Sequence, residues 1–187
     1  AALLSGLKWH DLGVTLPQLR RGLPWAGVVV VAVVLIIAVA VAIPPLREFF
    51  LDERWRSART ALFAAFVVIP LQTVLPEELL FRGVLQGALM RTWSVPVALT
   101  VGAVLFGMWH ITSSLHLAEG NEGLRDIVGG GNAGQIAGVA LSVVATTAAG
   151  LIFGWLRYKS DSLLTPIALH WALNATGALG AAIAWRL

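Results

Sequence analysis

Cysteine is missing from this chain altogether. Without thiols the protein can form no disulfide framework, and it has neither a thiolate nucleophile nor a thiolate metal ligand. The motif His-Glu-x-x-His, which places two zinc ligands and a general base on one helix, is missing as well. Any catalytic chemistry must therefore rest on other side chains.

Charge is also scarce. Only 12% of the 187 residues are charged and 58% are hydrophobic, whereas about a quarter of the residues of a soluble globular domain are charged. The net charge of +3 is small and the basic residues are scattered between apolar runs, so nothing indicates a nucleic-acid partner. The run Gly129-Gly130-Gly131 is not a phosphate-binding loop, because no Lys-Ser or Lys-Thr follows it.

Long apolar runs predict an all-α fold, a polytopic transmembrane bundle with about five spans. About 20 apolar residues are needed to cross the hydrocarbon core of a bilayer. The runs are residues 25–43, 60–91, 92–109, 135–156 and 162–185. The second run is too long for one ordinary span, and Pro70 and Pro76 interrupt it, so we expect a bend there.

The segments between these runs complete a single predicted membrane domain over residues 1–187. Residues 1–24 have the mixed composition of an interfacial segment, and residues 46–59 predict a charged connector with a short helix. Residues 111–134 predict a flexible loop long enough to act as a lid. The chain starts without an initiator Met, so a further span upstream of Ala1 is also expected.

Two adjacent carboxylates and a guanidinium stand out in an otherwise uncharged stretch: Glu77, Glu78 and Arg82. An ionisable side chain in lipid costs at least a few kcal/mol, so it is expected to face the bundle interior with a partner. On a helix Glu78 and Arg82 lie four apart and can pair, while Glu77 is rotated by about 100° and is free for chemistry. A buried Glu–Arg–Glu network that only locks helices together is the structural alternative.

Polar groups recur in two other spans, as His110 and as His170 with Asn174. His170 and Asn174 are four apart and share one helix face. A single histidine in a span is more often a packing residue than a catalyst. Two histidines, an asparagine and a glutamate pair on three spans instead indicate one common site, since facing helices of a bundle can bring such groups together.

Three motifs therefore follow one another along the chain: Glu77-Glu78-x-x-x-Arg82, Phe106-x-x-x-His110 and His170-x-x-x-Asn174. They resemble, in order, the motifs of the CAAX protease and bacteriocin-processing (CPBP or Abi) family of intramembrane proteases, which includes the type II CAAX prenyl endopeptidases. The resemblance covers about residues 60–187, the motif-bearing core, with no departure at the motif positions. The loop that ends at Gly134 is longer than the usual pattern, which bears on substrate access.

The resemblance implies a role for each motif residue. Glu77 would be the general base that activates a water, assisted by His110, and His170 and Asn174 would stabilise the oxyanion. Glu78 and Arg82 would hold Glu77 in place. No metal cofactor is expected, but a zinc ion bound by Glu77, His110 and His170 is an open alternative, since one glutamate and two histidines are a plausible zinc set.

The expected function is that of an integral-membrane endopeptidase that hydrolyses a peptide bond near the C-terminus of a membrane-associated substrate. Its partners would be membrane lipid and a peptide or lipidated protein, of the prenylated CAAX type or not. A non-catalytic membrane scaffold or bacteriocin-immunity protein of the same family is one alternative. A proton-coupled carrier is another, although no inverted repeat is visible.

Overall fold

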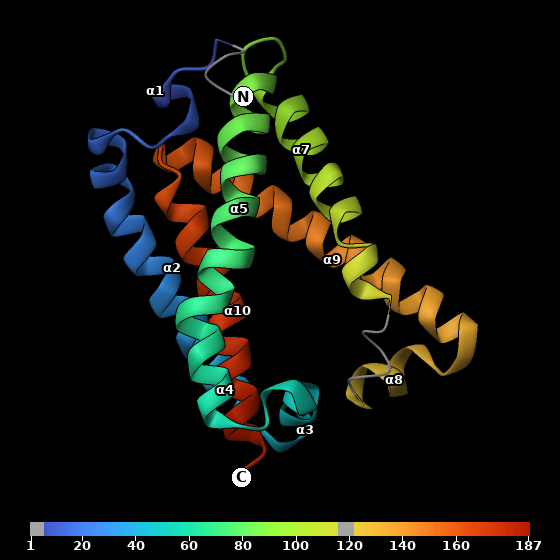
Figure 1. Ribbon diagram of the computed structural model, residues 1–187. Helices are drawn as coiled ribbons and strands as arrows, with labels where there is room; N and C mark the ends of the chain where they lie inside the picture. Colours follow the sequence, from blue (N-terminus) through green and yellow to red (C-terminus); the bar gives the residue numbers. More distant parts are fainter. Residues whose placement is uncertain (1–5, 116–121) are drawn as a thin grey trace.

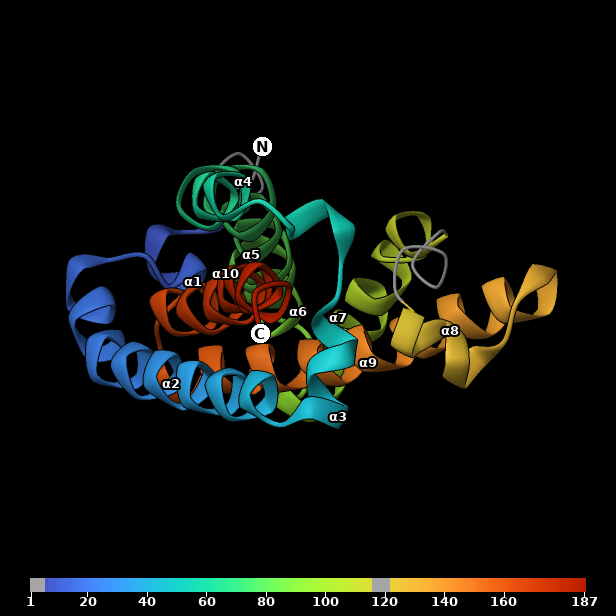
Figure 2. The ribbon, with the colours of Figure 1, turned by 90° about the horizontal axis from the view of Figure 1, so that it is seen from below.

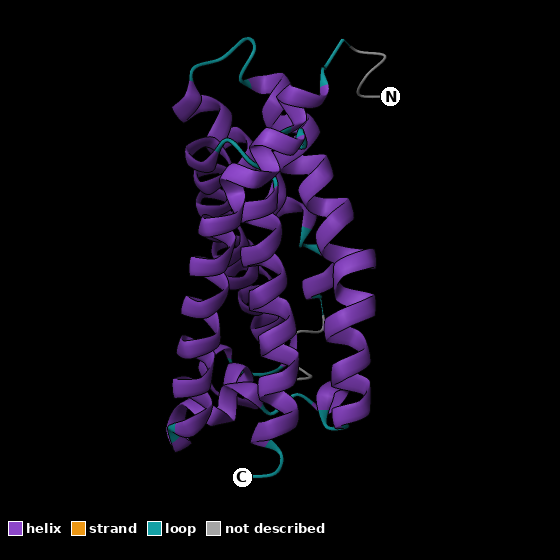
Figure 3. Cartoon of the chain, turned by 90° about the vertical axis from the view of Figure 1, so that its left-hand side faces the viewer, coloured by secondary structure: helices purple, strands orange, loops and turns teal. Residues whose placement is uncertain are grey.

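The computed structural model describes residues 6–115 and 122–187, and every regular element in these ranges is helical (Figure 3). The all-α class predicted from the sequence is confirmed for this part of the chain. In chain order the elements are α1 (Trp9–Leu12), α2 (Leu16–Ala42), α3 (Pro44–Arg47), η1 (Glu48–Phe50), η2 (Glu53–Trp55), α4 (Ala58–Phe63), η3 (Ala64–Val74), α5 (Leu75–Glu78), η4 (Leu79–Leu85), α6 (Gln86–Leu89), α7 (Val95–Trp109), η5 (Thr112–Ser114), α8 (Glu122–Val128), α9 (Gly131–Ser160) and α10 (Leu164–Ala184).

Within the described part of the chain, four helical stretches are long and apolar enough to cross a membrane. They are Trp9–Ala42, Ala58–Leu89, Gly131–Ser160 and Leu164–Ala184, and the shorter apolar helix α7 joins them. The expectation of about five spans agrees with this arrangement. Large apolar side chains such as Val28 and Ile36 lie more than half exposed along α2, and an apolar surface of this extent indicates contact with lipid.

Helix α10 occupies the middle of one half of the bundle, between α2 and the continuous rod formed by α4, η3, α5, η4 and α6 (Figures 1 and 2). Buried Ala64, Ile69 and Val74 of the rod pack with Ala178 of α10. On the other side α7 packs along α9, and Phe81, Phe106 and Phe153 form a second buried cluster that joins the rod to this pair. The rod therefore contacts both halves, and its middle carries the glutamate pair.

The rod continues through both prolines. Pro70 lies within η3, a stretch of π-helix, and Pro76 lies in the first turn of α5. The N–H of Leu75 donates to the carbonyl of Pro70, five residues back. The wider π turn relieves the clash that a proline ring causes in an ordinary α-helix. The glutamates therefore stay on a helix at membrane depth.

Two boundaries differ from the sequence-based expectation. Helix α2 of the first span begins at Leu16, not near residue 25, and it runs through Pro24. Its start is set by a capping interaction in which the N–H and hydroxyl of Thr15 both donate to Oε1 of Gln18. Residues 111–134 are not one irregular loop: η5 and α8 lie within them, and α9 begins at Gly131. The central part of the expected lid, residues 116–121, lies outside the described residues.

Close approach of α7 and α9 depends on Gly107. A Cβ atom at this position would lie 2.8 Å from the carbonyl oxygen of Val143 and would overlap the hydroxyl of Thr147. Small residues at such a contact let helix backbones approach closely in lipid. We expect Gly107→Ala to destabilise the protein by about 1–3 kcal/mol through overpacking, measured as a lower melting temperature in detergent.

Gly102 offers a matched control on the same helix. A Cβ atom there would meet nothing within 4 Å, so Gly102→Ala adds a methyl group without a clash and should leave the melting temperature unchanged or slightly raised. Equal melting temperatures for the two variants would contradict the close-packing argument.

Candidate active site

The two adjacent glutamates on α5 point to different neighbours. Glu78 is fully buried, whereas the side chain of Glu77 keeps 13% of its surface exposed. Successive residues of a helix are separated by about 100°, so one carboxylate faces the packed interior while the other faces a cavity. This divergence follows the expectation from the sequence.

Glu78 is the centre of a buried ionic network. Nη1 of Arg82 donates to Glu78 Oε1 at 3.0 Å, and Nδ1 of His170 lies 2.8 Å from the same oxygen. Nη2 of Arg82 also donates to the carbonyl of Gly150, and its guanidinium lies 3.9 Å from the centroid of the Phe106 ring. The network therefore ties the rod to α9 and α10 in the bundle interior.

The hydrogen bonds of this network hold His170 in place, while the expected support of Glu77 by Glu78 and Arg82 stays a prediction. The oxygen that accepts from Arg82 acts as an acceptor for His170 as well, so we assign the proton on the His170 ring to Nδ1. The other ring nitrogen, Nε2, is then available to groups in the cavity that His170 lines. The ring is further fixed by stacking on Phe153 at a centroid distance of 5.1 Å.

Glu77 faces the end of α7. Nε1 of Trp109 donates to Glu77 Oε1 at 3.3 Å, and Nε2 of His110 lies 3.8 Å from Glu77 Oε2. The other nitrogen of His110, Nδ1, lies 2.8 Å from the carbonyl oxygen of Phe106. A carbonyl can only accept, so Nδ1 carries a proton and Nε2 is the nitrogen presented to Glu77.

These groups share one cavity of about 610 Å³. It is lined by all four residues that the sequence singled out as catalytic candidates, Glu77, His110, His170 and Asn174. The ring of Phe106 lies between the two histidines, with centroid distances of 4.6 Å to His110 and 6.0 Å to His170. Three spans therefore bring their polar groups together, as the cost of burying each one alone requires.

Hydroxyl groups and one cation complete the cavity wall. The additional polar residues are Arg54, Thr73, Thr112, Ser113, Ser114, Ser142 and Thr146. The sequence analysis did not single out any of them, nor Trp109. A tryptophan next to a candidate histidine is a local signal that could have been noticed, but isolated serines and threonines in apolar spans carry none.

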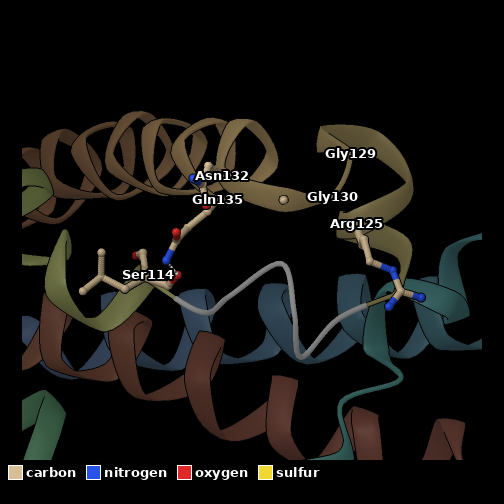
Figure 4. A pocket seen from close by; sticks show the side chains of 8 residues that line it. Ser114, Arg125, Gly129, Gly130, Asn132 and Gln135 are labelled. Carbon is tan, nitrogen blue, oxygen red and sulfur yellow. Dashed lines mark hydrogen bonds between the residues drawn. The ribbon is translucent and has the colours of Figure 1, made fainter.

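A smaller cavity of about 250 Å³ lies beside the first, at the junction of η5, α8 and the start of α9 (Figure 4). Ser114 lines both cavities, and Nε2 of Gln135 donates to the carbonyl of Leu115 across the smaller one. None of the described residues that line it carries a carboxylate or an imidazole. The candidate chemistry therefore belongs to the larger cavity.

The zinc alternative depends on whether Glu77, His110 and His170 can reach one metal ion. Within residues 6–115 and 122–187, no three His, Asp or Glu side chains come together at metal-ligand spacing. A catalytic zinc site needs three protein ligands at about 2.0–2.2 Å from one point. His170 donates Nδ1 to Glu78, an arrangement that is common for metal-binding histidines and leaves Nε2 available as a ligand. A zinc ion on Glu77, His110 and His170 therefore stays a prediction for metal analysis.

Comparison with protein families gives one match. The family model described as "Type II CAAX prenyl endopeptidase Rce1-like" matches residues 58–176, more than half of the chain. The chain belongs to this family. No match is found among curated proteins or among solved structures.

Membership of the Rce1-like family agrees with the helical architecture. The fold is that of a CAAX-type intramembrane protease, and with its four long apolar helices the chain is an integral membrane protein. The matched segment contains Glu77, Glu78, Arg82, His110, His170 and Asn174. It begins after the connector formed by α3, η1 and η2, so Arg54 lies outside it.

Proposed function

We propose that this Rce1-like protein is an intramembrane endopeptidase that hydrolyses a peptide bond near the C-terminus of a membrane-associated protein. Prenylated CAAX-type proteins are the first substrate class to test. The observation that carries the proposal is the opposition of Glu77 Oε2 and His110 Nε2 across 3.8 Å, in the same cavity as His170 and Asn174.

In the proposed reaction a water donates its hydrogens to Glu77 Oε2 and His110 Nε2. Two atoms 3.8 Å apart can both lie within hydrogen-bond distance of one water. Trp109 donates to the other oxygen of Glu77, which holds the carboxylate with Oε2 directed at the water. Glu77 takes one proton as the water oxygen attacks the scissile carbonyl carbon.

The attack creates a negative oxygen that the opposite wall would stabilise. Asn174 donates to it from its amide, and His170 donates to it from Nε2 once that nitrogen carries a proton, while Glu78 holds the ring in place through Nδ1. The proton on Glu77 then passes to the leaving nitrogen as the C–N bond breaks. One product gains a carboxyl group, the other an amino group, and Glu77 returns to its ionised form.

The hydroxyl groups of the cavity support a peptide as the substrate. An extended peptide carries unpaired N–H and C=O groups that must be satisfied away from water. Ser113, Ser142 and Thr146 line the same cavity as the catalytic candidates and supply donors and acceptors along the wall. A purely hydrocarbon cavity would reject such a backbone.

Cleavage by the purified protein tests the proposal. The protein is reconstituted in lipid vesicles with fluorescence-quenched peptides, prenylated and unprenylated, and the products are identified by mass spectrometry. We expect hydrolysis at one bond near the C-terminus that persists with a zinc chelator. Activity that is lost with the chelator and restored by zinc would contradict the metal-free mechanism, and a folded protein without cleavage would favour the scaffold alternative.

A further inference from the structure

Arg54 brings a permanent positive charge to the wall of the catalytic cavity. It lies on η2, in the connector between α2 and α4, and its side chain lines the cavity together with Glu77 and His170. Among the described residues of that wall, it is the single arginine or lysine. In Figure 2 the connector, drawn in cyan, crosses the end of the bundle near the C-terminus. The connector therefore brings this cation to the cavity wall.

The guanidinium of Arg54 is oriented before any substrate arrives. Asp52 accepts from the backbone N–H of Arg54, from Nε at 3.1 Å and from Nη2 at 2.6 Å. None of these bonds uses Nη1, so the edge formed by Nη1 and Nη2 stays available, and 69% of the side-chain surface is exposed. A guanidinium has two edges, and each edge can donate two hydrogen bonds to one carboxylate.

The connector itself is attached to the bundle. Nε1 of Trp185 donates to the backbone carbonyl of Asp52 at 3.2 Å, and Trp55 packs against the buried cluster of the rod and α10. The hydrogen bond to Asp52 raises the pKa of Arg54 above its usual value, although partial burial lowers it. Arg54 is therefore a fixed cation in a fixed place.

The position of Arg54 implies a separation from the reacting bond. Asn174 and Trp185 are eleven positions apart, which is about 16 Å along a helix, and the long side chain of Arg54 covers part of this distance. An extended peptide advances about 3.3 Å per residue. A group held by Arg54 would then lie roughly three to five residues from a bond held between Glu77 and Asn174.

We propose that Arg54 is a specificity-determining residue whose Nη1–Nη2 edge binds the C-terminal α-carboxylate of the substrate. The inference rests on the proposed protease function and deepens it. A free carboxylate is the negatively charged group that every peptide carries at its C-terminus, and it matches the bidentate geometry of a guanidinium. Arg54 would thereby convert a cavity that fits any extended peptide into one that selects chain ends.

The test compares two peptides of identical sequence, one with a free C-terminal carboxylate and one with a carboxamide. We expect the wild-type protein to prefer the free acid by about 10- to 100-fold in kcat/KM, the range for a charged hydrogen bond. The difference should appear mainly in KM, because the anchor binds substrate and transition state alike. Arg54→Gln should lower cleavage of the acid and thereby remove its preference over the amide.

Arg56→Gln is the matched control. Arg56 lies two residues away with a similar exposure of 65%, but it pairs with Glu53 and lies over the ring of Trp185, so its loss should keep the preference for the free acid. Arg54→Lys keeps the charge without the planar edge and should keep only part of the preference. A preference for the free acid that survives in Arg54→Gln would overturn the inference. So would a wild type that cleaves both peptides equally well.

Binding to an inactive background separates this inference from the proposed reaction. In Glu77→Gln the affinity of the fluorescently labelled acid should exceed that of the amide, and adding Arg54→Gln should remove the difference. This difference in binding would support Arg54 as the anchor even if the wild type cleaved neither peptide. Failure to cleave would remove the proposed protease function and leave the binding role of Arg54 standing. An amidated peptide ending in Asp should bind as weakly as the plain amide, and binding equal to the free acid would overturn selectivity for the chain end.

Discussion

Glu77→Gln is expected to fold normally and to lose proteolysis. Glutamine keeps the oxygen that accepts from Trp109, and its amide can donate to Nε2 of His110 where the carboxylate lay 3.8 Å away. It cannot take a proton from water. The loss of a positioned general base typically lowers the rate by about 10²–10⁴-fold, so kcat/KM on a cleavable peptide should fall by that factor while the melting temperature stays at the wild-type value.

Glu48→Gln is the control for the loss of one negative charge. Glu48 is exposed on η1 of the connector, away from the cavity wall, so this variant should cleave at the wild-type rate. If Glu77→Gln also retained near wild-type proteolysis, Glu77 would not be the base and the proposed mechanism would have to be abandoned.

Arg82→Ala is expected to damage the protein as a structure. Arg82 is 2% exposed and Glu78 is fully buried, so the substitution leaves a buried carboxylate with only His170 beside it. Breaking a buried ion pair by removing one partner costs about 3–5 kcal/mol. The carbonyl of Gly150 and the ring of Phe106 also lose their contact with the guanidinium. Purification yield and melting temperature in detergent should both fall.

A double variant separates the orphaned charge from the lost packing. Glu78→Gln combined with Arg82→Met removes both charges and keeps most of the side-chain volume, so it should recover part of the stability. Arg91→Ala serves as a surface control, because Arg91 pairs with Asp11 at 3.6 Å in an exposed position, where ion pairs contribute little. An inactive Arg82→Ala protein with an unchanged melting temperature would indicate a direct catalytic or substrate-binding role instead.

The helical class, the approximate number of spans and the pair of Glu78 with Arg82 could be predicted from the sequence, because they depend on local patterns. A run of about 20 apolar residues forms a helix in lipid so that its own backbone groups are satisfied. Residues four apart on a helix are neighbours whatever surrounds them. The meeting of His110, His170 and Asn174 with Glu77 was predictable for a related reason, since the cost of isolated polar groups in lipid is the same on every span.

Only the tertiary structure decided which glutamate lies next to which histidine. His170 contacts Glu78 and His110 faces Glu77 because of the rotation of α10 and α7 around the rod, and side-chain packing between helices sets that rotation. The position of Arg54 at the cavity depended on the fold even more. Arg54 reaches the cavity only because the connector is attached to the end of α10 at Trp185. Contacts between segments more than a hundred residues apart have no local pattern in the chain, so the composition of the connector could not indicate that one of its arginines lines the cavity of the candidate site.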